Sequence, residues 1–467
     1  MKKRTMVYLV TYFLPIPVVL YIRPDYNFFN DLFYYQLANS SQRTKDVAYF
    51  IFHSEIEQGF FSPLRTIFEL LQYVASFNNP SILLVINSWI VISLIFAYMT
   101  FVPKEEIFKG ISNRTIFVLL TMAWPWTLDL FIYPGTVEKF LLLTLLINIY
   151  FINSKFASST HNSIWIVFFF SLIVVGVLFR IQFLTFIPAL LYLLFTNGKL
   201  RRRRSLLIIL SPILLGVGLL LHIFLNGEYT SKSYFSLSHY FDVFSQVFSY
   251  LPNLIFIFVL CILLLTHFVI LIKYRKNVNF LDLNFWFLLI IFYSLPLLVW
   301  GKLGYHLSIL GFLLSLYILR GFQILFKGLT LKKKFFQPLF NFLFLFAILF
   351  SIFKLTYSLN PASSLRDFFQ SKTAVDLNDS SATIFLNCTE GAERIPIFAD
   401  RYLKPNKINF YQYSLKSYLE EGANNFFILG NSTFCPLPKE LTQNLQSAWS
   451  SSKFNSYTLY KLQIRIN

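Results

Sequence analysis

Charged residues are scarce in this sequence. Only 13% of its 467 residues are Asp, Glu, Lys or Arg, about half the share expected of a soluble globular domain. Cysteine is scarcer still: Cys261, Cys388 and Cys435 are too few for a disulfide framework and lack the spacing of a metal-ligand cluster. Together with a mean hydropathy of +0.59, these shortages argue against a soluble globular protein.

Several catalytic motifs are also missing. The sequence has no nucleophile elbow of the GxSxG type, no Walker loop, no Rossmann glycine pattern and no HExxH. Each of these motifs places a nucleophile, a phosphate-binding loop or a pair of zinc ligands in a fixed local geometry. Their absence argues against soluble nucleotide chemistry and zinc chemistry, and it leaves weak support for a hydrolytic triad.

The chain has long hydrophobic runs instead. Hydrophobic residues make up 56% of it and aromatic residues 19%. Because about 20 helical residues cross a hydrocarbon core of roughly 30 Å, we expect a polytopic α-helical membrane protein with about eleven transmembrane helices. The basic stretch MKKRT precedes the first run, but no small-residue cleavage site follows it, so we expect an uncleaved helix. The expected spans are 6–22, 81–102, 115–132, 137–153, 163–179, 182–197, 205–225, 251–272, 284–300, 303–319 and 335–353.

Basic residues concentrate in alternate loops. A formal charge of +18 could indicate nucleic-acid binding, but clusters such as KLRRRR (199–204) and KYRK (273–276) lie between hydrophobic runs, and we expect no nucleic-acid partner. The positive-inside rule assigns the N-terminus and these loops to the cytoplasm, which places the C-terminus outside. The membrane is the inner or plasma membrane if the protein is bacterial and the endoplasmic reticulum if it is eukaryotic.

Acidic residues have the opposite distribution. Asp and Glu contribute little to topology, so their concentration on the outer side points to a function there. The inner loops before residue 354 hold Glu105, Glu106 and Asp282. The outer loops and outer span ends hold Asp25, Asp31, Asp46, Glu55, Glu57, Glu69, Asp129, Glu138, Glu228 and Asp242.

The composition divides the chain into two domains. We expect a transmembrane domain over 1–354 and a small soluble α/β domain over 355–467, outside the cytoplasm. The second domain has strand-like stretches such as TIFLN and NNFFILG, and we expect helices over 414–421 and 439–450. Whether Cys388 and Cys435 form a disulfide in this domain is left open.

The first outer loop, 23–80, is long. In it Ile67, Leu70, Leu71 and Val74 fall at helical spacing, which predicts an amphipathic helix lying at the outer membrane interface. The loop opens with YIRPDYNFFNDLFYYQ, where two carboxylates lie among seven aromatic rings. Rings at this depth are typical of an interfacial belt, and stacking on sugar or lipid is the alternative.

Acids and cations recur at the outer ends of further spans. They occur in TLDLFIYPGTVEKF, LFRIQF, GEYTSKSYF and WGKLGYHL. This mixture suits the displacement of an anionic leaving group by a hydroxyl, because a carboxylate can orient or remove the proton while cations stabilise the phosphate charge that develops.

Four stretches resemble motifs of a known superfamily in their order along the chain. They are RPDYNFFND, SEIEQGFFSPLRT, GTVEKF and FRIQFLTFIPALL. They are similar to the PDE motif, the acidic-aromatic segment, the Glu-ending motif and the Arg-containing segment of GT-C glycosyltransferases that use polyprenyl-phosphate sugars. Among these the chain most resembles family 22, the mannosyltransferases of the dolichol and GPI-anchor pathways. Tyr26 stands where that PDE motif has its second acid, and GKLGYHLSILGF lacks the family's Glu and Arg, so we expect a divergent member with an open donor sugar and acceptor.

The resemblance implies an enzyme. A membrane glycosyltransferase of GT-C type would transfer a hexose, mannose-like, from a polyprenyl-phosphate donor to a lipid-linked or glycan acceptor on the extracytoplasmic face, with inversion. No cofactor is required by the sequence, no residue is assigned to a metal, and a divalent metal is left open. Besides donor, acceptor and membrane lipids we assign no partner. The alternatives are a multi-span lipid or solute transporter or flippase, and a catalytically inactive GT-C-like scaffold.

Seven residues are candidates for the site. Asp25 is the expected base that activates the acceptor hydroxyl, and a capping or solvated acid is its alternative. Arg180 is expected to contact the donor phosphate, against a snorkelling side chain, and Lys302 and His306 could complete that phosphate site, although a lone His at a helix start is often structural. The residues expected to bind sugar hydroxyls or to hold Arg180 are Asp31, Glu57 and Glu138.

Overall fold

The structure is a computed structural model. It describes residues 10–22, 34, 37–38, 40–51, 62–77, 79–107, 112–124, 126–158, 163–196, 251–274, 279–300 and 304–325, a few single positions from 338 to 370, and five strands between 382 and 462. The chain divides into two compact units. One comprises 1–39, 73–86 and 353–467, and the other comprises 40–72 and 87–352. The second unit carries the candidate site.

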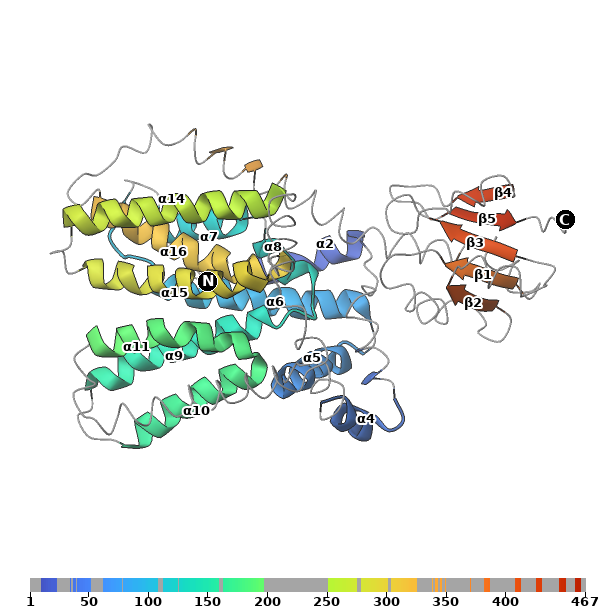
Figure 1. Ribbon diagram of the computed structural model, residues 1–467, viewed down its shortest axis with the longest axis horizontal. Coiled ribbons are helices and arrows are strands. Elements are labelled where there is room, and N and C mark those ends of the chain that lie inside the picture. The colour runs from blue at the N-terminus through green and yellow to red at the C-terminus, as the bar shows by residue number, and fades with distance from the viewer. Residues whose placement is uncertain are drawn as a thin grey trace. The chain divides into compact units, whose positions relative to one another are not determined.

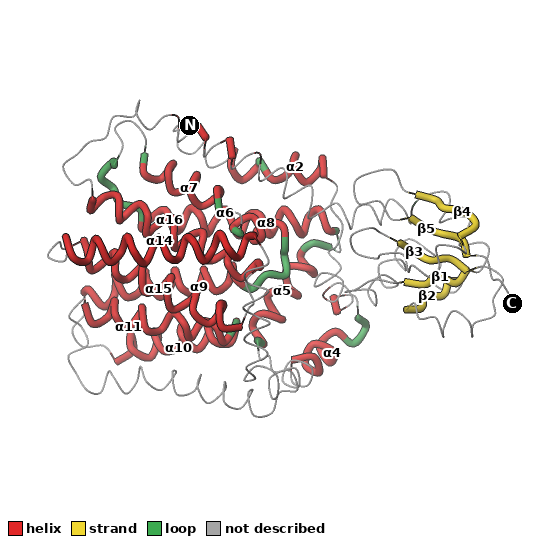
Figure 2. The backbone as a smooth tube through the Cα atoms, turned by 45° about the horizontal axis from the view of Figure 1, so that its top comes forward, coloured by secondary structure: helices red, strands yellow, loops and turns green. Residues whose placement is uncertain are grey.

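Helices dominate the described part of the chain up to residue 325. The helices α9, α11, α14 and α15 run nearly along one direction in both Figure 1 and Figure 2, with α9 packed on α10 and α15 packed on α16. The α-helices are α2 (Pro15–Ile22), α4 (Arg43–Tyr49), α5 (Pro63–Ala75), α6 (Pro80–Tyr98), α7 (Asn113–Ala123), α8 (Thr127–Ile132), α9 (Glu138–Ser158), α10 (Ser163–Phe179), α11 (Ile187–Thr196), α14 (Leu251–Tyr274), α15 (Asn279–Trp300) and α16 (Ser308–Leu325). Short 3-10 helices are η2 (Met99–Phe101), η3 (Ile181–Phe186) and η4 (Gly304–Leu307).

Three of the described helices are long and apolar enough to cross a membrane. They are Pro80–Phe101, Phe256–Lys273 and Ser308–Leu325. These helices support the coarse prediction of a helical membrane protein. The count of about eleven spans stays a prediction, because the expected spans 205–225 and 335–353 lie largely outside the described residues.

One expected span is broken. The run 115–132 forms two short helices, α7 and α8, instead of one. Trp124, which ends α7, is extended at φ −72° and ψ 123°, and the residue after it in the sequence is Pro125. Proline disfavours the helical conformation of the residue before it and has no N–H for the helix ladder. The break turns the chain so that α8 packs on α16 and η4.

The two ends of the helix bundle carry different polar contacts. At one end, Arg320 near the end of α16 pairs with Asp282 in the first turn of α15, and its guanidinium lies 6.0 Å from the ring centroid of Trp286. Arg320 also donates to the carbonyl of Phe101, at the end of η2. This is the end where the sequence predicts cytoplasmic loops. The start of α9 lies at the opposite end, together with the end of α10 and the start of α16.

Helix α5 is amphipathic in an unusual sense. Its polar residues Thr66, Glu69 and Gln72 are buried, whereas the apolar Ile67 and Leu71 are 40% and 55% exposed. A helix in water would turn these faces the other way, whereas an apolar outer face suits contact with lipid. The position of α5 at the outer membrane interface stays a prediction, and its inward polar face brings Glu69 and Gln72 towards the candidate site.

The other unit contains a five-stranded sheet with the strand order β2-β1-β3-β5-β4 (Figure 2). Strand β1 lies between β2 and β3 and pairs in parallel with both, with Ile384 opposite Phe410 and Phe427, and Ile384 is buried. The strands β5 and β4 continue the sheet with antiparallel pairing. The strands are β1 (Ala382–Leu386), β2 (Ile408–Gln412), β3 (Phe426–Gly430), β4 (Leu445–Ser450) and β5 (Thr458–Leu462).

The expected helix over 439–450 is wrong in its second half. Residues 445–450 form β4, whose backbone pairs with β5 from Leu445↔Leu462 to Ser450↔Thr458. Pairing with a neighbouring strand overrides a weak local preference for helix. The other expected helix, 414–421, and both cysteines of this region lie outside the described residues. The α/β class and the domain limits 1–354 and 355–467 therefore stay predictions.

Candidate functional site

Three segments that are far apart in the sequence meet at one end of the bundle. Glu138 is the first residue of α9, Arg180 directly follows α10, and His306 lies in η4 just before α16. Hydrogen bonds to main-chain atoms hold two of these positions: Arg180 N donates to Gly176 O at 3.0 Å, and the Tyr293 side-chain hydroxyl donates to His306 O at 2.9 Å. Each side chain thus stands where an apolar helix begins or ends.

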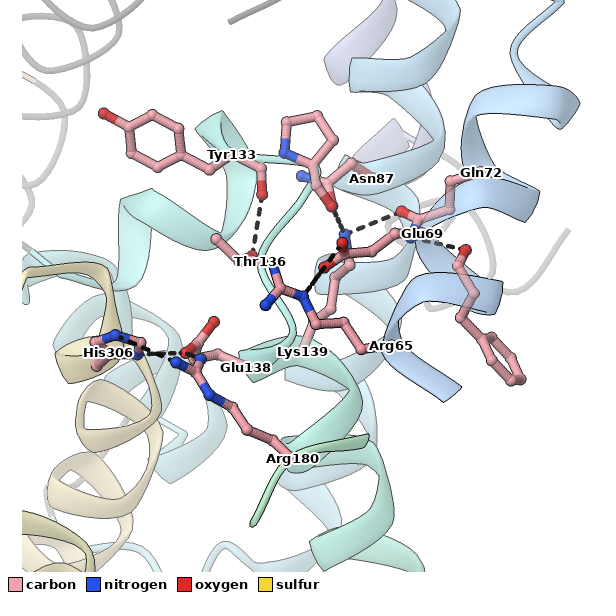
Figure 3. Close-up of polar contacts among 12 residues, drawn as sticks. Arg65, Glu69, Gln72, Asn87, Tyr133, Thr136, Glu138, Lys139, Arg180 and His306 are labelled. Carbon is pink, nitrogen blue, oxygen red and sulfur yellow. Dashed lines mark hydrogen bonds and ion pairs between the residues drawn. The ribbon is translucent and has the colours of Figure 1, made fainter. Parts of the chain in front are cut away.

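One carboxylate oxygen joins the three side chains. Glu138 Oε1 accepts hydrogen bonds from Arg180 Nη1 at 2.6 Å and from His306 Nδ1 at 2.7 Å. Figure 3 shows Glu138 between the other two side chains. The Glu138 side chain is 0% exposed, and those of Arg180 and His306 are 12% and 7% exposed. A buried charge is tolerated only when it is paired and hydrogen-bonded, which this arrangement provides.

The contacts also assign the tautomer of His306. Arg180 Nη2 lies 3.4 Å from His306 Nε2. A guanidinium has only donors, so Nε2 is the acceptor and the ring proton is on Nδ1, which donates to Glu138. The cluster therefore contains an imidazole, a carboxylate and a guanidinium, and a guanidinium presents its N–H donors in a planar fork that suits an anion.

The second oxygen of Glu138 differs from the first. Oε2 is buried and, within the described ranges, accepts no hydrogen bond. A buried acceptor without a donor is costly. This oxygen is the group of the cluster that could accept a hydrogen bond from a substrate hydroxyl.

A second polar cluster lies at the start of α9, around the residue that follows Glu138. Lys139, the residue after Glu138, is completely buried. Its ammonium donates to Gln72 Oε1 at 2.9 Å, to Asn87 Oδ1 at 2.7 Å and to the carbonyl of Pro134. Figure 3 shows Asn87 and Gln72 converging on Lys139, away from His306.

Aromatic contacts join helix α5 to the start of α9 and to the end of α10. The Phe68 ring centroid is 5.5 Å from that of Phe140 and 5.2 Å from that of Phe179, and the last two rings stack at 5.3 Å. Phe140 follows Lys139, and Phe179 precedes Arg180. One turn before, on α5, Arg65 Nε pairs with the buried Glu69 at 3.2 Å. The aromatic rings thus cover the part of the site between α9 and α10.

The structure brings together three of the seven candidate residues: Glu138, Arg180 and His306. The other four, Asp25, Asp31, Glu57 and Lys302, lie outside the described residues, and all seven roles stay predictions. Within the described ranges, no group of three His, Cys, Asp or Glu side chains could hold a metal ion.

Three polar residues of the site were not predicted from the sequence: Lys139, Gln72 and Asn87. Asn87 lies in the apolar run 81–102 and Gln72 in an amphipathic segment, where single polar residues are common. The available signal was the position of Lys139 at the start of an apolar run, because a lysine there needs hydrogen-bond partners.

Comparisons with known proteins add little. No family model matches the chain, and no curated protein matches it. The crystal structure of ArnT from Cupriavidus metallidurans in the apo state is similar, with 10% sequence identity, a TM-score of 0.38, and coverage of 98% of this chain and 96% of that chain. A likeness this weak shows neither the fold nor the function of this chain.

Proposed function

We propose that this protein is an integral membrane glycosyltransferase. It transfers a hexose, mannose-like, from a polyprenyl-phosphate donor to a lipid-linked or glycan acceptor on the extracytoplasmic face of the membrane, with inversion. The observation that carries the proposal is the convergence of Glu138, Arg180 and His306, which are 42, 126 and 168 residues apart in pairs, at the end of the bundle predicted to face outward.

Arg180 is the donor-phosphate contact in this proposal. A snorkelling arginine extends its head group into water, whereas the guanidinium of Arg180 is held by Glu138 and lies beside His306. Fixed N–H donors of this kind stabilise charge on a leaving group without having to reorganise during the reaction. This arrangement therefore suits stabilisation of a lipid phosphate that leaves the anomeric carbon, a role that a purely structural ion pair does not have.

The remaining roles follow from the chemistry. Glu138 Oε1 positions Arg180 and His306, and Oε2 accepts a hydrogen bond from a sugar hydroxyl. Asp25 is proposed as the base that takes the proton of the acceptor hydroxyl, which then attacks the anomeric carbon as the phosphate leaves. A single displacement of this kind inverts the configuration at that carbon.

The test is sugar transfer in membranes. Wild type, Arg180→Gln, Asp25→Asn and the control Arg43→Gln would be assayed with a panel of radiolabelled polyprenyl-phosphate sugars and endogenous acceptors. Arg43 lies in α4 and is exposed. We expect transfer by wild type and control, and a loss of about 100-fold or more in Arg180→Gln, the effect of removing one donor to a developing oxyanion. Asp25→Asn is expected to lose transfer while folding normally.

Other results would contradict the proposal in different ways. Equal transfer by wild type and Arg180→Gln would remove Arg180 from the mechanism, and equal transfer by Asp25→Asn would remove Asp25. No transfer by wild type from any donor in the panel would overturn the glycosyltransferase function and favour a transporter or an inactive scaffold.

A further inference from the structure

Lys139 directly follows Glu138 but binds a separate set of groups. We propose that Lys139 is a positioning residue: its bonds to α5, α6 and the α8–α9 turn fix the first turn of α9 and, through Glu138, the positions of Arg180 and His306. The catalytic consequence of this inference rests on the proposed glycosyltransferase function, whereas the structural coupling does not.

Within the described residues, Lys139 donates to three acceptors from three different segments. Gln72 belongs to α5, Asn87 to α6 and Pro134 to the turn before α9. An ammonium has three N–H donors in tetrahedral directions, so three oxygens at hydrogen-bond distance can define its position completely. The first turn of α9 is thereby tied to all three segments through one buried atom.

The acceptors are themselves held in place. The amide nitrogen of Gln72 donates to Phe68 O at 3.3 Å. The amide nitrogen of Asn87 donates to Leu130 O at 2.7 Å and to Phe131 O at 2.9 Å. These bonds determine which end of each amide faces Lys139, and they connect α6 to the carbonyls near the end of α8. Gln72 and Asn87 are therefore held by hydrogen bonds of their own, and together they form an ordered support for the Lys139 ammonium.

Lys139 and Glu138 anchor the start of α9 from two directions. Consecutive helical residues point about 100° apart, and Figure 3 shows the two side chains reaching different groups. A shift of the helix start changes the geometry of the 2.6 Å and 2.7 Å contacts of Glu138 Oε1. A misplacement of about 1 Å can cost about 100-fold in rate. The position of Lys139 thus sets the geometry of the proposed phosphate contact.

Activity is tested with Lys139→Met, which keeps an unbranched side chain but removes the donors, and with Lys45→Met as the matched control, since Lys45 is exposed on α4. Per folded enzyme, we expect Lys139→Met to lower kcat/KM at least tenfold and the control to leave it unchanged. The double variant Lys139→Met/Arg180→Gln is expected to lose less activity than the product of the two single losses, because Lys139 acts in part through Arg180. A multiplicative loss in the double variant, or no loss in Lys139→Met, would overturn the inference.

Stability is measured in the same variants, so that the inference is tested even if no donor is transferred. Thermal unfolding in detergent of Lys139→Met, Glu138→Gln and the double variant gives a coupling between the two sites. We expect the double variant to lose less Tm than the sum of the two single losses, and an additive result would overturn the inference. If wild type transfers no sugar but the coupling is present, the proposed function fails and the positioning role stands.

A milder substitution covers the case in which Lys139→Met does not fold. Gln72→Met removes one of the three acceptors and leaves Asn87 and Pro134 in place. We expect the same direction of change with a smaller magnitude, and the same non-additivity with Arg180→Gln in transfer and with Glu138→Gln in Tm. Wild-type values of both readouts in a folded Gln72→Met would contradict the inference.

Discussion

At the residue scale, the central feature is a carboxylate that serves two donors through one oxygen. Glu138 is fully buried, so its charge has lost its hydration and is stabilised by the guanidinium of Arg180 and the N–H of His306. Breaking a buried ion pair by removing one partner costs more than the pair contributes, because the other charge is then left uncompensated. The three side chains therefore depend on one another.

This dependence predicts the effect of Glu138→Gln. The substitution leaves Arg180 without its carboxylate, and we expect a loss of about 3 kcal/mol in unfolding free energy, measured by denaturant or thermal unfolding in detergent. The double variant Glu138→Gln/Arg180→Gln is expected to recover part of this loss, because no uncompensated charge remains. Glu106→Gln, on an exposed side chain, is the control and should change little. A Glu138→Gln protein as stable as wild type would contradict the described pairing.

The sequence predicts that Glu138, Arg180 and His306 lie at the same side of the membrane, but it does not predict that they contact one another. Hydrophobic runs end near Glu138, Arg180 and His306, so the run limits alone put all three at the same side of a membrane. Which of the outer acids meets Arg180 depends on how α9 packs on α10. Glu138 and Arg180 are 42 residues apart, and no local pattern carries that information. Asn87 and Gln72 were missed for the same reason, since their partner lies in another helix.

At the element scale, two features explain how helices reach the site. The apolar run 115–132 had the composition of one span, yet the proline after Trp124 divides it. The short α8 that results packs on η4 and α16. The amphipathic character of α5 was predictable from its spacing, but the direction of its polar face was not, because spacing alone does not say whether water or lipid lies outside.

The close packing of α8 on α16 predicts the effect of Gly311→Ala. A Cβ at Gly311 would overlap Thr127 Oγ1 and lie 3.4 Å from Trp124 Cβ, so one helix must shift. Overpacking of this kind costs about 1 to 3 kcal/mol, which a Tm measurement in detergent would detect. Adding Thr127→Ala should restore much of the loss by removing the overlapping oxygen.

Gly321 on the same helix provides the control. A Cβ there would meet Ile270 Cδ1 at 3.9 Å, an ordinary contact, and alanine is favoured over glycine in a helix by about 1 kcal/mol. Gly321→Ala should therefore leave Tm unchanged or raise it. Equal losses at Gly311 and Gly321 would show that α8 does not pack closely on α16.

At the scale of the whole molecule, the helical unit has two unlike ends. One has the Asp282–Arg320 pair with Glu105 nearby, where Gln323 Nε2 donates to Glu105 Oε2 at 3.2 Å. The other has Glu138, Arg180 and His306. Charge bias along the sequence predicted the same division before any contact was known, because loop charge reports topology directly. The two ends are therefore predicted to face opposite sides of the membrane.

Cysteine labelling would test the orientation. In a background with Cys261, Cys388 and Cys435 replaced by serine, Thr44→Cys and Glu106→Cys each place one thiol on an exposed position. We expect a membrane-impermeant maleimide to label Thr44→Cys in right-side-out vesicles and to label Glu106→Cys only after permeabilisation, since residue 44 lies in the expected outer loop and residue 106 in an inner one. The reverse pattern would place Glu138, Arg180 and His306 at the cytoplasmic face. A donor on that face would then have to be sought among cytoplasmic sugar carriers, which makes this labelling the experiment that decides where the substrate must be supplied.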